Sequence, residues 1–450
     1  MLELIGLTSI DELFGTIPAA LRLAGGLSMD KGMSEPDVME HFTNLGAGNA
    51  PVGRDLVCFA GGGAYDHEVP AVTRALASRS ELVTAYTPYQ AEVAQGVLQA
   101  LFEYQTMVAR LAGLDVANAS LYDGAHALLE GVNLAAAATG RSTVWVSEGV
   151  KPRWLQVLAT ASRGTRRPSD VRLIALDQCT GTTSWPEAPP GAGGSEAPSG
   201  EALPGAIVVA NPNYLGCLEE MGRARAVAAA CGAELIVVFD PVCAGIISSP
   251  GSAGASIAVG EGQALGAPLS FGGPYLGLFS CAMKHVRRIP GRIVGRTVDS
   301  RGKTAYVTTL RAREQDIRRE RASSNVCTNE TLLAVGAAIQ MSWLGTSGLA
   351  EIALRSARGA RYCREALLAI PGVEPLTTAS TLREFAVRAP AGGETIIERM
   401  LDDGFLAGVA LAPGESPSGF EGGLLVAVTE RRTKAEIDAY AAAFEKAARP

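Results

Sequence analysis

Asp240, near the middle of the chain, has the type and setting of a residue that does chemistry. The run Leu235-Ile-Val-Val-Phe239 predicts a buried strand, and Asp240 follows it directly. A carboxylate at the carboxyl end of a parallel strand points into the crevice where open α/β sheets bind ligands, and there it can pair with a pyridinium nitrogen. An aspartate that only hydrogen-bonds the next loop is an equally good interpretation of this one residue.

Gln263 lies in a glycine-rich segment, Gly260–Pro274. In a pyridoxal-phosphate enzyme of the aminotransferase type, the Schiff-base lysine is expected downstream of the strand-end aspartate, just before such a turn. A carboxamide cannot form an imine, so covalent attachment of the cofactor at Gln263 is excluded. No lysine occurs between Lys151 and Lys284, and Lys284 lies beyond the turn in a basic stretch that we interpret as a solvated surface.

The segment Ser120–Gly124 precedes a predicted helix that begins at Ala125. Backbone N–H groups at a helix N-terminus bind phosphate, because they are unpaired and lie at the positive end of the helix dipole. Asp123, however, is placed to cap the same donors and would repel an anion. We therefore favour a capping role for Asp123 over a phosphate site.

The loop Thr84–Gln90 concentrates polar side chains ahead of a predicted helix. Pro88 fixes part of the backbone, so the loop offers a rigid platform for ring stacking or hydrogen bonding. The alternative is an ordered loop whose tyrosines fill a core. The candidate residues are Tyr86, Thr87, Tyr89 and Gln90, with His67 from the earlier segment Gly61–His67.

The elements that position these residues indicate an α/β fold. Short apolar runs at 142–146, 171–176, 207–210 and 235–239 predict buried strands, and the stretches between them predict helices, as in a mostly parallel sheet. We expect an amino-terminal arm and interface segment (1–85), a large domain (86–330) and a smaller carboxy-terminal α/β domain (331–450). Residues 184–204, rich in Pro, Gly, Ser and Ala, are expected to form a flexible surface insertion.

Composition narrows the class of protein. With 450 residues, a formal net charge of −7 and a pI near 5.4, the chain has no surplus of positive charge for nucleic acid or an anionic membrane. The cysteines form no CxxC pair and are interpreted as reduced thiols, and no metal site is predicted. Residues 1–17 lack basic side chains, unlike a signal peptide, and no apolar run suits a membrane span. We therefore expect a cytoplasmic protein.

Several longer strings are recognisable when taken together. They are Gly62-Gly-Ala-Tyr-Asp-His67, Thr84-Ala-Tyr-Thr-Pro-Tyr-Gln90, Gln95-Gly96, Tyr122-Asp-Gly124, Asn211-Pro-Asn-Tyr214, Gly260-Glu-Gly-Gln263, Phe271-Gly-Gly-Pro-Tyr275, Pro290-Gly-Arg-Ile-Val-Gly-Arg-Thr297, Arg313-Glu-Gln-Asp-Ile-Arg-Arg319 and Ser324-Asn-Val-Cys-Thr-Asn329. In this order the chain resembles the amino-terminal subunit of two-subunit glycine decarboxylases, the P-proteins of the glycine cleavage system. The resemblance covers nearly the whole chain.

The resemblance implies a pyridoxal-phosphate-dependent transferase fold of the aminotransferase type (fold type I). It also implies a second, lysine-bearing subunit that holds pyridoxal phosphate, assembly as a dimer of heterodimers, and transfer of the aminomethyl group of glycine to the lipoyl arm of H-protein. In that setting Tyr86, Thr87, Tyr89 and Gln90 are expected to face the subunit junction, with His67 in the same wall. Asp240 and Gln263 would mark a lapsed cofactor site.

The sequence departs from the family pattern at a few places. Lys151 stands where such subunits often carry histidine, and Thr381–Phe385 matches less closely. Two alternatives stay open. One is a self-sufficient pyridoxal-phosphate lyase or transaminase that uses Lys284 or Lys151, and the other is a purely structural or regulatory subunit.

Overall fold

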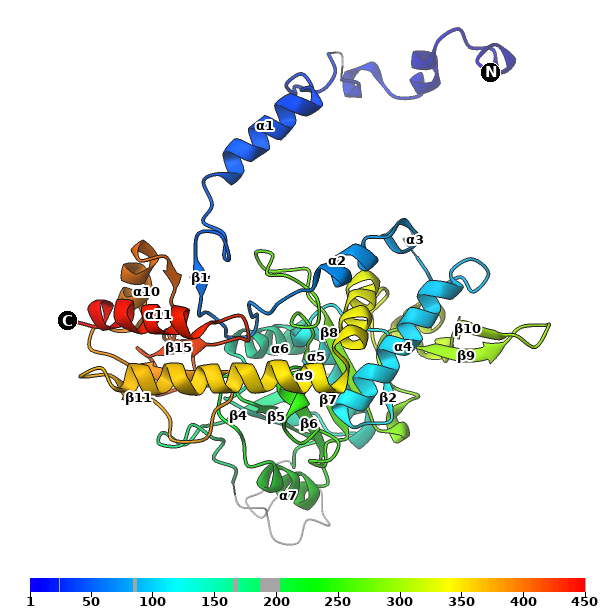
Figure 1. Ribbon diagram of the computed structural model, residues 1–450. Coiled ribbons are helices and arrows are strands. Elements are labelled where there is room, and N and C mark those ends of the chain that lie inside the picture. Colours follow the sequence, from blue (N-terminus) through cyan, green and yellow to red (C-terminus); the bar gives the residue numbers. More distant parts are fainter. Residues whose placement is uncertain (24, 84–86, 165–168, 187–202, 450) are drawn as a thin grey trace. The chain divides into compact units, whose positions relative to one another are not determined.

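Among the described residues, the chain from Val52 onward is organised around a seven-stranded sheet of order β2-β8-β7-β6-β5-β3-β4 (Figure 1). The computed structural model describes residues 1–23, 25–83, 87–164, 169–186 and 203–449. Strands β3 to β7 run parallel, and β8 is antiparallel to both of its neighbours. The strands are β2 (Val116–Ala117), β3 (Thr143–Ser147), β4 (Asp170–Ile174), β5 (Ala206–Asn211), β6 (Glu234–Phe239), β7 (Ile257–Glu261) and β8 (Gly277–Cys281).

Both faces of this sheet are covered by helices. Successive residues of a strand point to opposite faces, so Ile207 packs in one hydrophobic core and Val208 in the other. Helices α4, α7 and α9 contribute to the first core, and α5 and α6 to the second. Their bounds are α4 (Gln95–Ala112), α5 (Gly124–Thr139), α6 (Pro152–Gly164), α7 (Met221–Cys231) and α9 (Thr331–Leu368). The predicted α/β fold with a mostly parallel sheet is confirmed.

The C-terminal lobe holds a four-stranded antiparallel sheet of order β11-β12-β15-β14. An early segment of the chain joins this lobe, because β1 (Val57–Cys58) pairs with β13 (Phe405–Leu406) and Phe59 stacks on Tyr440 with ring centroids 3.9 Å apart. The next residues, Gly61–His67, are therefore held beside the lobe. The other elements are β11 (Glu374–Pro375), β12 (Glu384–Arg388), β14 (Val409–Ala410), β15 (Leu424–Ala427), α10 (Gly393–Asp402) and α11 (Lys434–Ala447).

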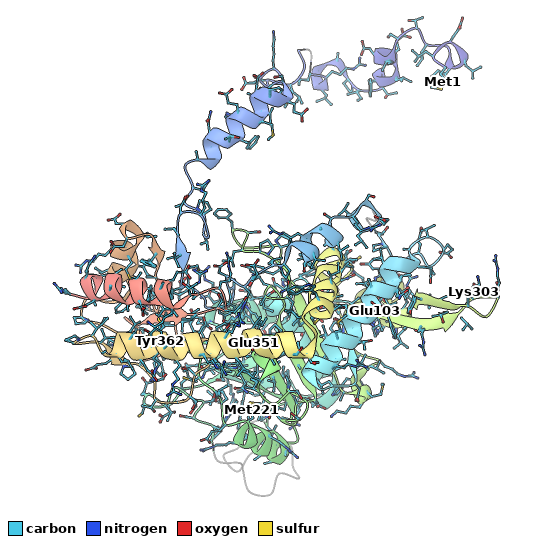
Figure 2. All side chains as sticks on the ribbon, in the orientation of Figure 1. Met1, Glu103, Met221, Lys303, Glu351 and Tyr362 are labelled. Carbon is cyan, nitrogen blue, oxygen red and sulfur yellow. The ribbon has the colours of Figure 1, made fainter. Side chains whose placement is uncertain are left out.

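The long helix α9 links the two lobes and carries Glu351 and Tyr362 (Figure 2). Within α9, Gly345 has a non-helical backbone (φ 60°, ψ −175°), so two helical stretches meet there at a kink. By length and composition α9 would suffice to cross a membrane. It packs against α2 (Ala71–Ala77), α4 and α11, and 44% of its most apolar stretch is buried. We interpret α9 as a core helix.

Smaller elements complete this unit. The hairpin β9 (Val294–Val298) and β10 (Thr304–Thr308) projects with Lys303 in its turn (Figure 2). Near the two ends of the predicted insertion 184–204, Trp185 and Leu203 are buried in the first core. Residues 187–202 lie outside the described part of the chain.

Residues Met1–Pro51 form a separate unit. It holds three short 3₁₀ helices and α1 (Glu35–Gly46), which begins at a cap where the Asp37 N–H donates to the Ser34 hydroxyl. No described residue of this unit is buried. Large apolar side chains such as Phe14, Leu21 and Phe42 are exposed. This unit therefore has no hydrophobic core of its own.

Candidate active-site crevice

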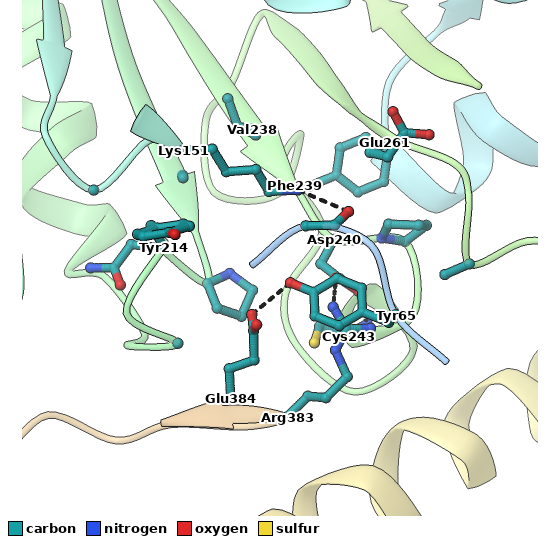
Figure 3. Close-up of a pocket in the computed structure, with 18 of the residues that line it drawn as sticks. Tyr65, Lys151, Tyr214, Val238, Phe239, Asp240, Cys243, Glu261, Arg383 and Glu384 are labelled. Carbon is teal, nitrogen blue, oxygen red and sulfur yellow. Dashed lines mark hydrogen bonds and ion pairs between the residues drawn. The ribbon is translucent and has the colours of Figure 1, made fainter. Parts of the chain in front are cut away.

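A crevice lies beyond the carboxyl ends of β6 and β7, where open parallel sheets bind ligands (Figure 3). Asp240 follows β6 and Gln263 follows β7. The C-terminal lobe supplies another wall where β12 begins. The residues that matter below are Tyr65, Lys151, Asp240, Glu261, Gln263, Arg383 and Glu384. The structure thus brings the sequence-predicted pair Asp240 and Gln263 into one pocket.

The Asp240 carboxylate forms an ion pair with the Arg383 guanidinium. Its other oxygen accepts hydrogen bonds from the backbone N–H groups of Val242 and Cys243, both at 2.9 Å. Burial raises the pKa of this carboxyl, but the Arg383 charge and the Cys243 N–H outweigh burial and hold it below its ordinary value. Asp240 is therefore a half-buried, ionised carboxylate whose charge is balanced from within the chain.

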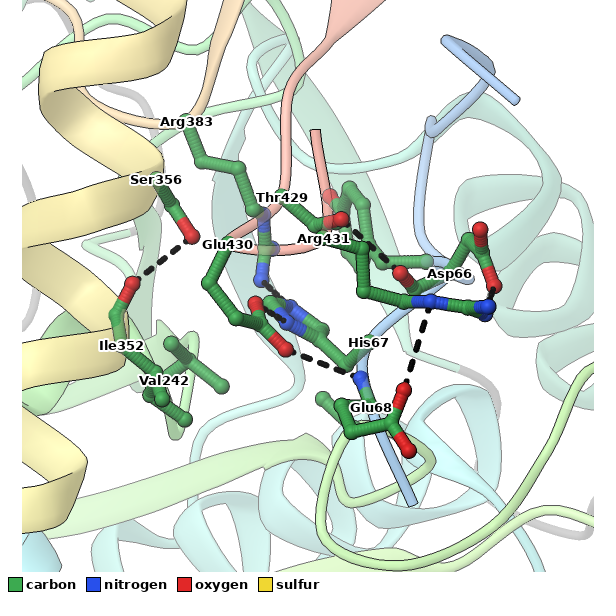
Figure 4. Close-up of polar contacts among 12 residues, drawn as sticks. Asp66, His67, Glu68, Val242, Ile352, Ser356, Arg383, Thr429, Glu430 and Arg431 are labelled. Carbon is green, nitrogen blue, oxygen red and sulfur yellow. Dashed lines mark hydrogen bonds and ion pairs between the residues drawn. The ribbon is translucent and has the colours of Figure 1, made fainter. Parts of the chain in front are cut away.

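Arg383 also contacts two aromatic rings. Its guanidinium carbon lies 3.3 Å from the centroid of the Tyr65 ring, and one of its amino groups lies 2.7 Å from Nε2 of His67. A guanidinium only donates, so Nε2 accepts and the ring proton sits on Nδ1. Nδ1 then donates to Glu430 at 2.6 Å (Figure 4). His67 is thus a buried imidazole whose two nitrogens are both engaged.

Residues Gly61–His67 form a strap along the crevice. The Tyr65 hydroxyl and the Gly62 N–H each donate to the Glu384 carboxylate at 2.6 Å. A Cβ at Gly61 would overlap Glu384, which explains why glycine is required there. Burial raises the pKa of the Glu384 carboxyl. The strap is thereby fastened to the first residue of β12.

The Gln263 side chain holds the same strap from the other side. Its carbonyl oxygen accepts from the Tyr65 N–H at 2.9 Å, and its amide nitrogen donates to the carbonyls of Tyr65 and Ala267 at 3.2 and 2.7 Å. The side chain is 2% exposed. Both donor hydrogens are used, so the residue at the predicted lysine position is a hydrogen-bonding clasp.

Two carboxylates occupy the N-terminus of α5. Asp123 accepts from the His126 N–H at 2.7 Å, which confirms the predicted cap. Glu261 accepts from the Gly124 N–H and, with its other oxygen, from the Gln263 and Leu276 N–H groups, all at 2.9 Å. Burial raises the pKa of Glu261 to about 7, although these hydrogen bonds oppose the shift.

The two lysines considered as alternatives lie in different settings. Lys284 is 60% exposed and pairs with Glu234 at 2.9 Å, in agreement with the predicted surface role. Lys151 instead lines the crevice, where its ammonium donates to the Gly63 carbonyl at 3.2 Å and lies 4.7 Å from the Trp154 ring centroid. Burial lowers the pKa of Lys151.

These contacts do not fit pyridoxal phosphate. That cofactor is recognised through a Schiff-base lysine, a charged partner for the pyridine nitrogen and N–H donors for the phosphate. Here Gln263 stands at the position where the sequence predicts a lysine, and Arg383 pairs with Asp240. Glu261 accepts the Gly124 N–H that a phosphate at α5 would need. All three recognition elements are engaged by groups of this chain.

The described residues of the predicted loop, Thr87, Tyr89 and Gln90, do not line this pocket. Tyr86 falls outside the described residues. The Tyr89 hydroxyl donates to Asn329, and the Arg292 guanidinium lies 4.8 Å from the Tyr89 ring centroid. Thr87 and Gln90 are exposed, and among the described residues their side chains make no hydrogen bond. His67 belongs to the Arg383 network, and its side chain makes no hydrogen bond with the described loop residues 87–90.

Sequence reasoning overlooked Arg383, Glu384, Glu261 and Tyr65 as crevice residues. Tyr65 and Glu261 stood inside recognised motifs. Arg383 and Glu384 carried one signal, since two charged residues open an apolar run that reads as a buried strand. Charged residues at the start of a buried strand need ionic or hydrogen-bonding partners, but the sequence does not show which residues these partners are.

Comparison with known proteins gives a consistent result. Residues 1–444 match the family model described as glycine cleavage system P-protein. The chain is 44% identical over 449 residues to a probable glycine dehydrogenase (decarboxylating) subunit 1 of Chlorobium chlorochromatii, covering 99% of this chain and 96% of the relative. A protein of the same description from Moorella thermoacetica is 43% identical over 444 residues, with 99% and 96% covered.

Solved structures agree with these relatives. A crystal structure of glycine decarboxylase (P-protein) of the glycine cleavage system, in inhibitor-bound form, superposes with a TM-score of 0.89 at 40% identity, covering 99% of this chain and 97% of that chain. A sphingosine-1-phosphate lyase from Burkholderia pseudomallei is similar in fold only, with a TM-score of 0.65 at 14% identity over 95% and 93% of the two chains.

Proposed function

Because the chain belongs to the glycine cleavage system P-protein family, as a subunit of glycine decarboxylase, we propose that it works with a second, lysine-bearing subunit that holds pyridoxal phosphate. Gln263 carries this proposal. It stands at the expected lysine position, and its amide is fully used in holding the strap. We infer that the reactive amine comes from another polypeptide.

The cofactor, held by the partner, would act as the electron sink when glycine loses carbon dioxide. The aminomethyl group would then pass to the lipoamide of H-protein. The role of this chain is to complete the active site at the subunit junction and to orient glycine or the lipoyl group. We assign that role to Tyr86, Thr87, Tyr89 and Gln90. The exposed side chains of Thr87 and Gln90, which make no hydrogen bond among the described residues, support this assignment, because they are available to a partner or substrate.

The amino-terminal unit supplies a means of assembly. Its apolar side chains have no core within the unit, and exposed apolar surface of this kind marks protein interfaces. Val38, Met39, Phe42 and Leu45 recur at helical spacing on α1, so they share one face. We assign residues 1–51 to contact with the lysine-bearing subunit, in a dimer of heterodimers.

Co-purification tests the partnership. The full chain is expected to co-elute with a lysine-bearing homologue, and the mixture is expected to exchange carbon dioxide with glycine. Deletion of residues 1–51 is expected to abolish co-elution. If the shortened chain still co-elutes with the homologue and the mixture still exchanges carbon dioxide, residues 1–51 are not part of the interface. A full chain that neither pairs nor activates the homologue would refute the proposal.

Junction variants separate catalysis from a purely structural role. Tyr86→Phe and Tyr89→Phe are assayed in the reconstituted pair for carbon dioxide exchange. Full exchange by both variants would make the tyrosines structural and favour a regulatory or scaffold subunit.

One observation keeps the stand-alone enzyme as a second candidate. Lys151 lines the crevice and its pKa is lowered by burial, as in lysines that form imines. We expect the isolated chain with added pyridoxal phosphate to lack absorbance near about 420 nm, where a lysine-bound cofactor absorbs. Borohydride trapping on Lys151, lost in Lys151→Arg, would establish the alternative.

We also propose a cytoplasmic location. The acidic net charge and the burial of α9 against α2, α4 and α11 support a soluble protein. Recovery of the full chain in the soluble cytoplasmic fraction, with none in membranes, is the expected result of cell fractionation.

A further inference from the structure

Charged groups of this chain lie at the two places where a cofactor of this fold would present charge. At the end of β6, the Arg383 guanidinium faces Asp240, where a pyridinium nitrogen would be recognised. At the N-terminus of α5, the Glu261 carboxylate accepts the Gly124 N–H, where a phosphate would bind. A guanidinium and a carboxyl group of the protein thus occupy the two places where the cation and the anion of the cofactor would be recognised.

The ring of Tyr65 completes the arrangement. It packs against the Arg383 guanidinium, and its hydroxyl donates to Glu384 (Figure 3). Tyr65 belongs to the strap, Asp240 to the large sheet, and Arg383 and Glu384 to the C-terminal lobe. One set of buried contacts therefore joins three parts of the chain that are distant in sequence.

We propose that Tyr65, Asp240, Arg383 and Glu384 form a permanent clamp that has replaced the cofactor as the link between the large sheet and the C-terminal lobe. The crevice is then a structural joint, closed by charges of the chain itself. Restoring the missing lysine would not restore cofactor binding, because Arg383 and Glu261 hold the remaining recognition sites. The clamp deepens the proposed function, since it rests on the cofactor belonging to the partner.

The energetics of buried charge support a clamp. The Arg383 side chain is 4% exposed and the Asp240 side chain 16% exposed. Ions so far removed from water need each other, and removal of one leaves the other unpaired at a large cost. When both are neutralised together, that penalty disappears. The two residues should therefore behave as a coupled pair.

A lysine-restoration experiment addresses the cofactor. Wild type and Gln263→Lys are purified without the partner, mixed with pyridoxal phosphate, and examined by absorbance near about 420 nm and by mass spectrometry after borohydride reduction. Both proteins are expected to stay colourless and unmodified. A pyridoxyl group on residue 263 of the variant would overturn the proposal, because the crevice would then be open.

A stability cycle addresses the clamp and does not depend on whether Gln263→Lys folds. The thermal midpoint of the isolated chain is measured for wild type, Arg383→Met, Asp240→Asn and the double variant. Each single change is expected to lower the thermal midpoint. The midpoint of the double variant should fall by less than the sum of the two single decreases. The control is Arg355→Met, which breaks the exposed Glu351–Arg355 pair and should leave the midpoint unchanged.

Additive losses in this cycle, or single variants as stable as wild type, would refute the clamp. Both experiments use the isolated chain, whereas the proposed function is tested on the reconstituted pair. If the stability cycle shows no coupling but the reconstituted pair is active, the clamp is refuted and the proposed function stands. If the cycle shows coupling but the reconstituted pair is inactive, the proposed function is refuted and the clamp stands.

Discussion

The crevice and the Thr87–Gln90 loop treat their polar groups in opposite ways. In the crevice, Asp240, Gln263 and Glu384 find partners within the chain, and the strap lies against them. In the loop, Tyr89 is anchored to Asn329 while Thr87 and Gln90 are exposed. A polar group paired inside the protein contributes to its stability, and an exposed unpaired one is available to another molecule. The crevice is therefore interpreted as a structural contact within the chain, and the exposed part of the loop as a surface that can bind a partner.

The largest effect is expected from Glu384→Ala in the crevice. The change leaves the Tyr65 hydroxyl and the Gly62 N–H without their acceptor and removes a buried charge near Arg383. We expect the free energy of unfolding to fall by about 3–5 kcal/mol in urea titrations. Glu365→Ala, which removes an exposed carboxylate paired with Arg361, is the control. If both changes lowered the free energy of unfolding equally, the contacts of the crevice would be no more important for stability than an exposed ion pair.

The pH dependence of stability provides a second test of the difference between the crevice and the loop. The pKa of Glu261 is about 7 in the folded chain against 4.5 in the unfolded one. Between these values the unfolded chain releases the proton and the folded chain keeps it, so rising pH favours unfolding. The difference in unfolding free energy between wild type and Glu261→Gln should therefore shrink by about 3 kcal/mol from pH 4.5 to 7 and stay constant above.

Urea titrations at several pH values measure this difference. Glu415→Gln, on a carboxylate that is 52% exposed, is the matched control and should keep the wild-type profile. A Glu261→Gln profile parallel to wild type would show that burial does not hold the proton.

Tyr89→Phe probes the anchored residue of the loop. The substitution removes both hydrogen bonds with Asn329, the one that the hydroxyl donates to the side-chain oxygen and the one that it accepts from the backbone N–H, and keeps the ring beneath Arg292. The expected loss in the isolated chain is about 1 kcal/mol. Tyr306→Phe is the control, because the Tyr306 hydroxyl makes no hydrogen bond among the described residues. A loss above that of the crevice variants would make the loop a structural element.

The smallest effect on stability is expected for Thr87→Ala and Gln90→Ala. Their side chains are exposed, so the unfolding free energy of the isolated chain should change by less than about 0.5 kcal/mol. Carbon dioxide exchange by the reconstituted pair should fall by about tenfold or more, as expected when groups that orient a reactant are lost. The control is Gln99→Ala, an exposed glutamine on α4. Unchanged exchange would place both residues outside the active site.

Much of the fold was accessible from local patterns. The apolar runs that predicted β5 and β6 are buried strands, because a strand covered on both faces needs apolar side chains at every position. Asp123 caps α5 as predicted, since a cap depends only on neighbouring residues. Lys151 was harder to place. The sequence offered it as an alternative lysine, and only the fold brings it beside the Gly63 carbonyl.

The sequence by itself determined that residue 263 cannot hold the cofactor covalently, because a side-chain amide forms no imine wherever the fold places it. Tertiary structure decided what fills the crevice. Arg383 meets Asp240 across 143 residues, and Tyr65 meets Glu384 across 319. Charge pairing acts through space, so contacts between such distant residues leave no local pattern by which a single sequence could reveal them.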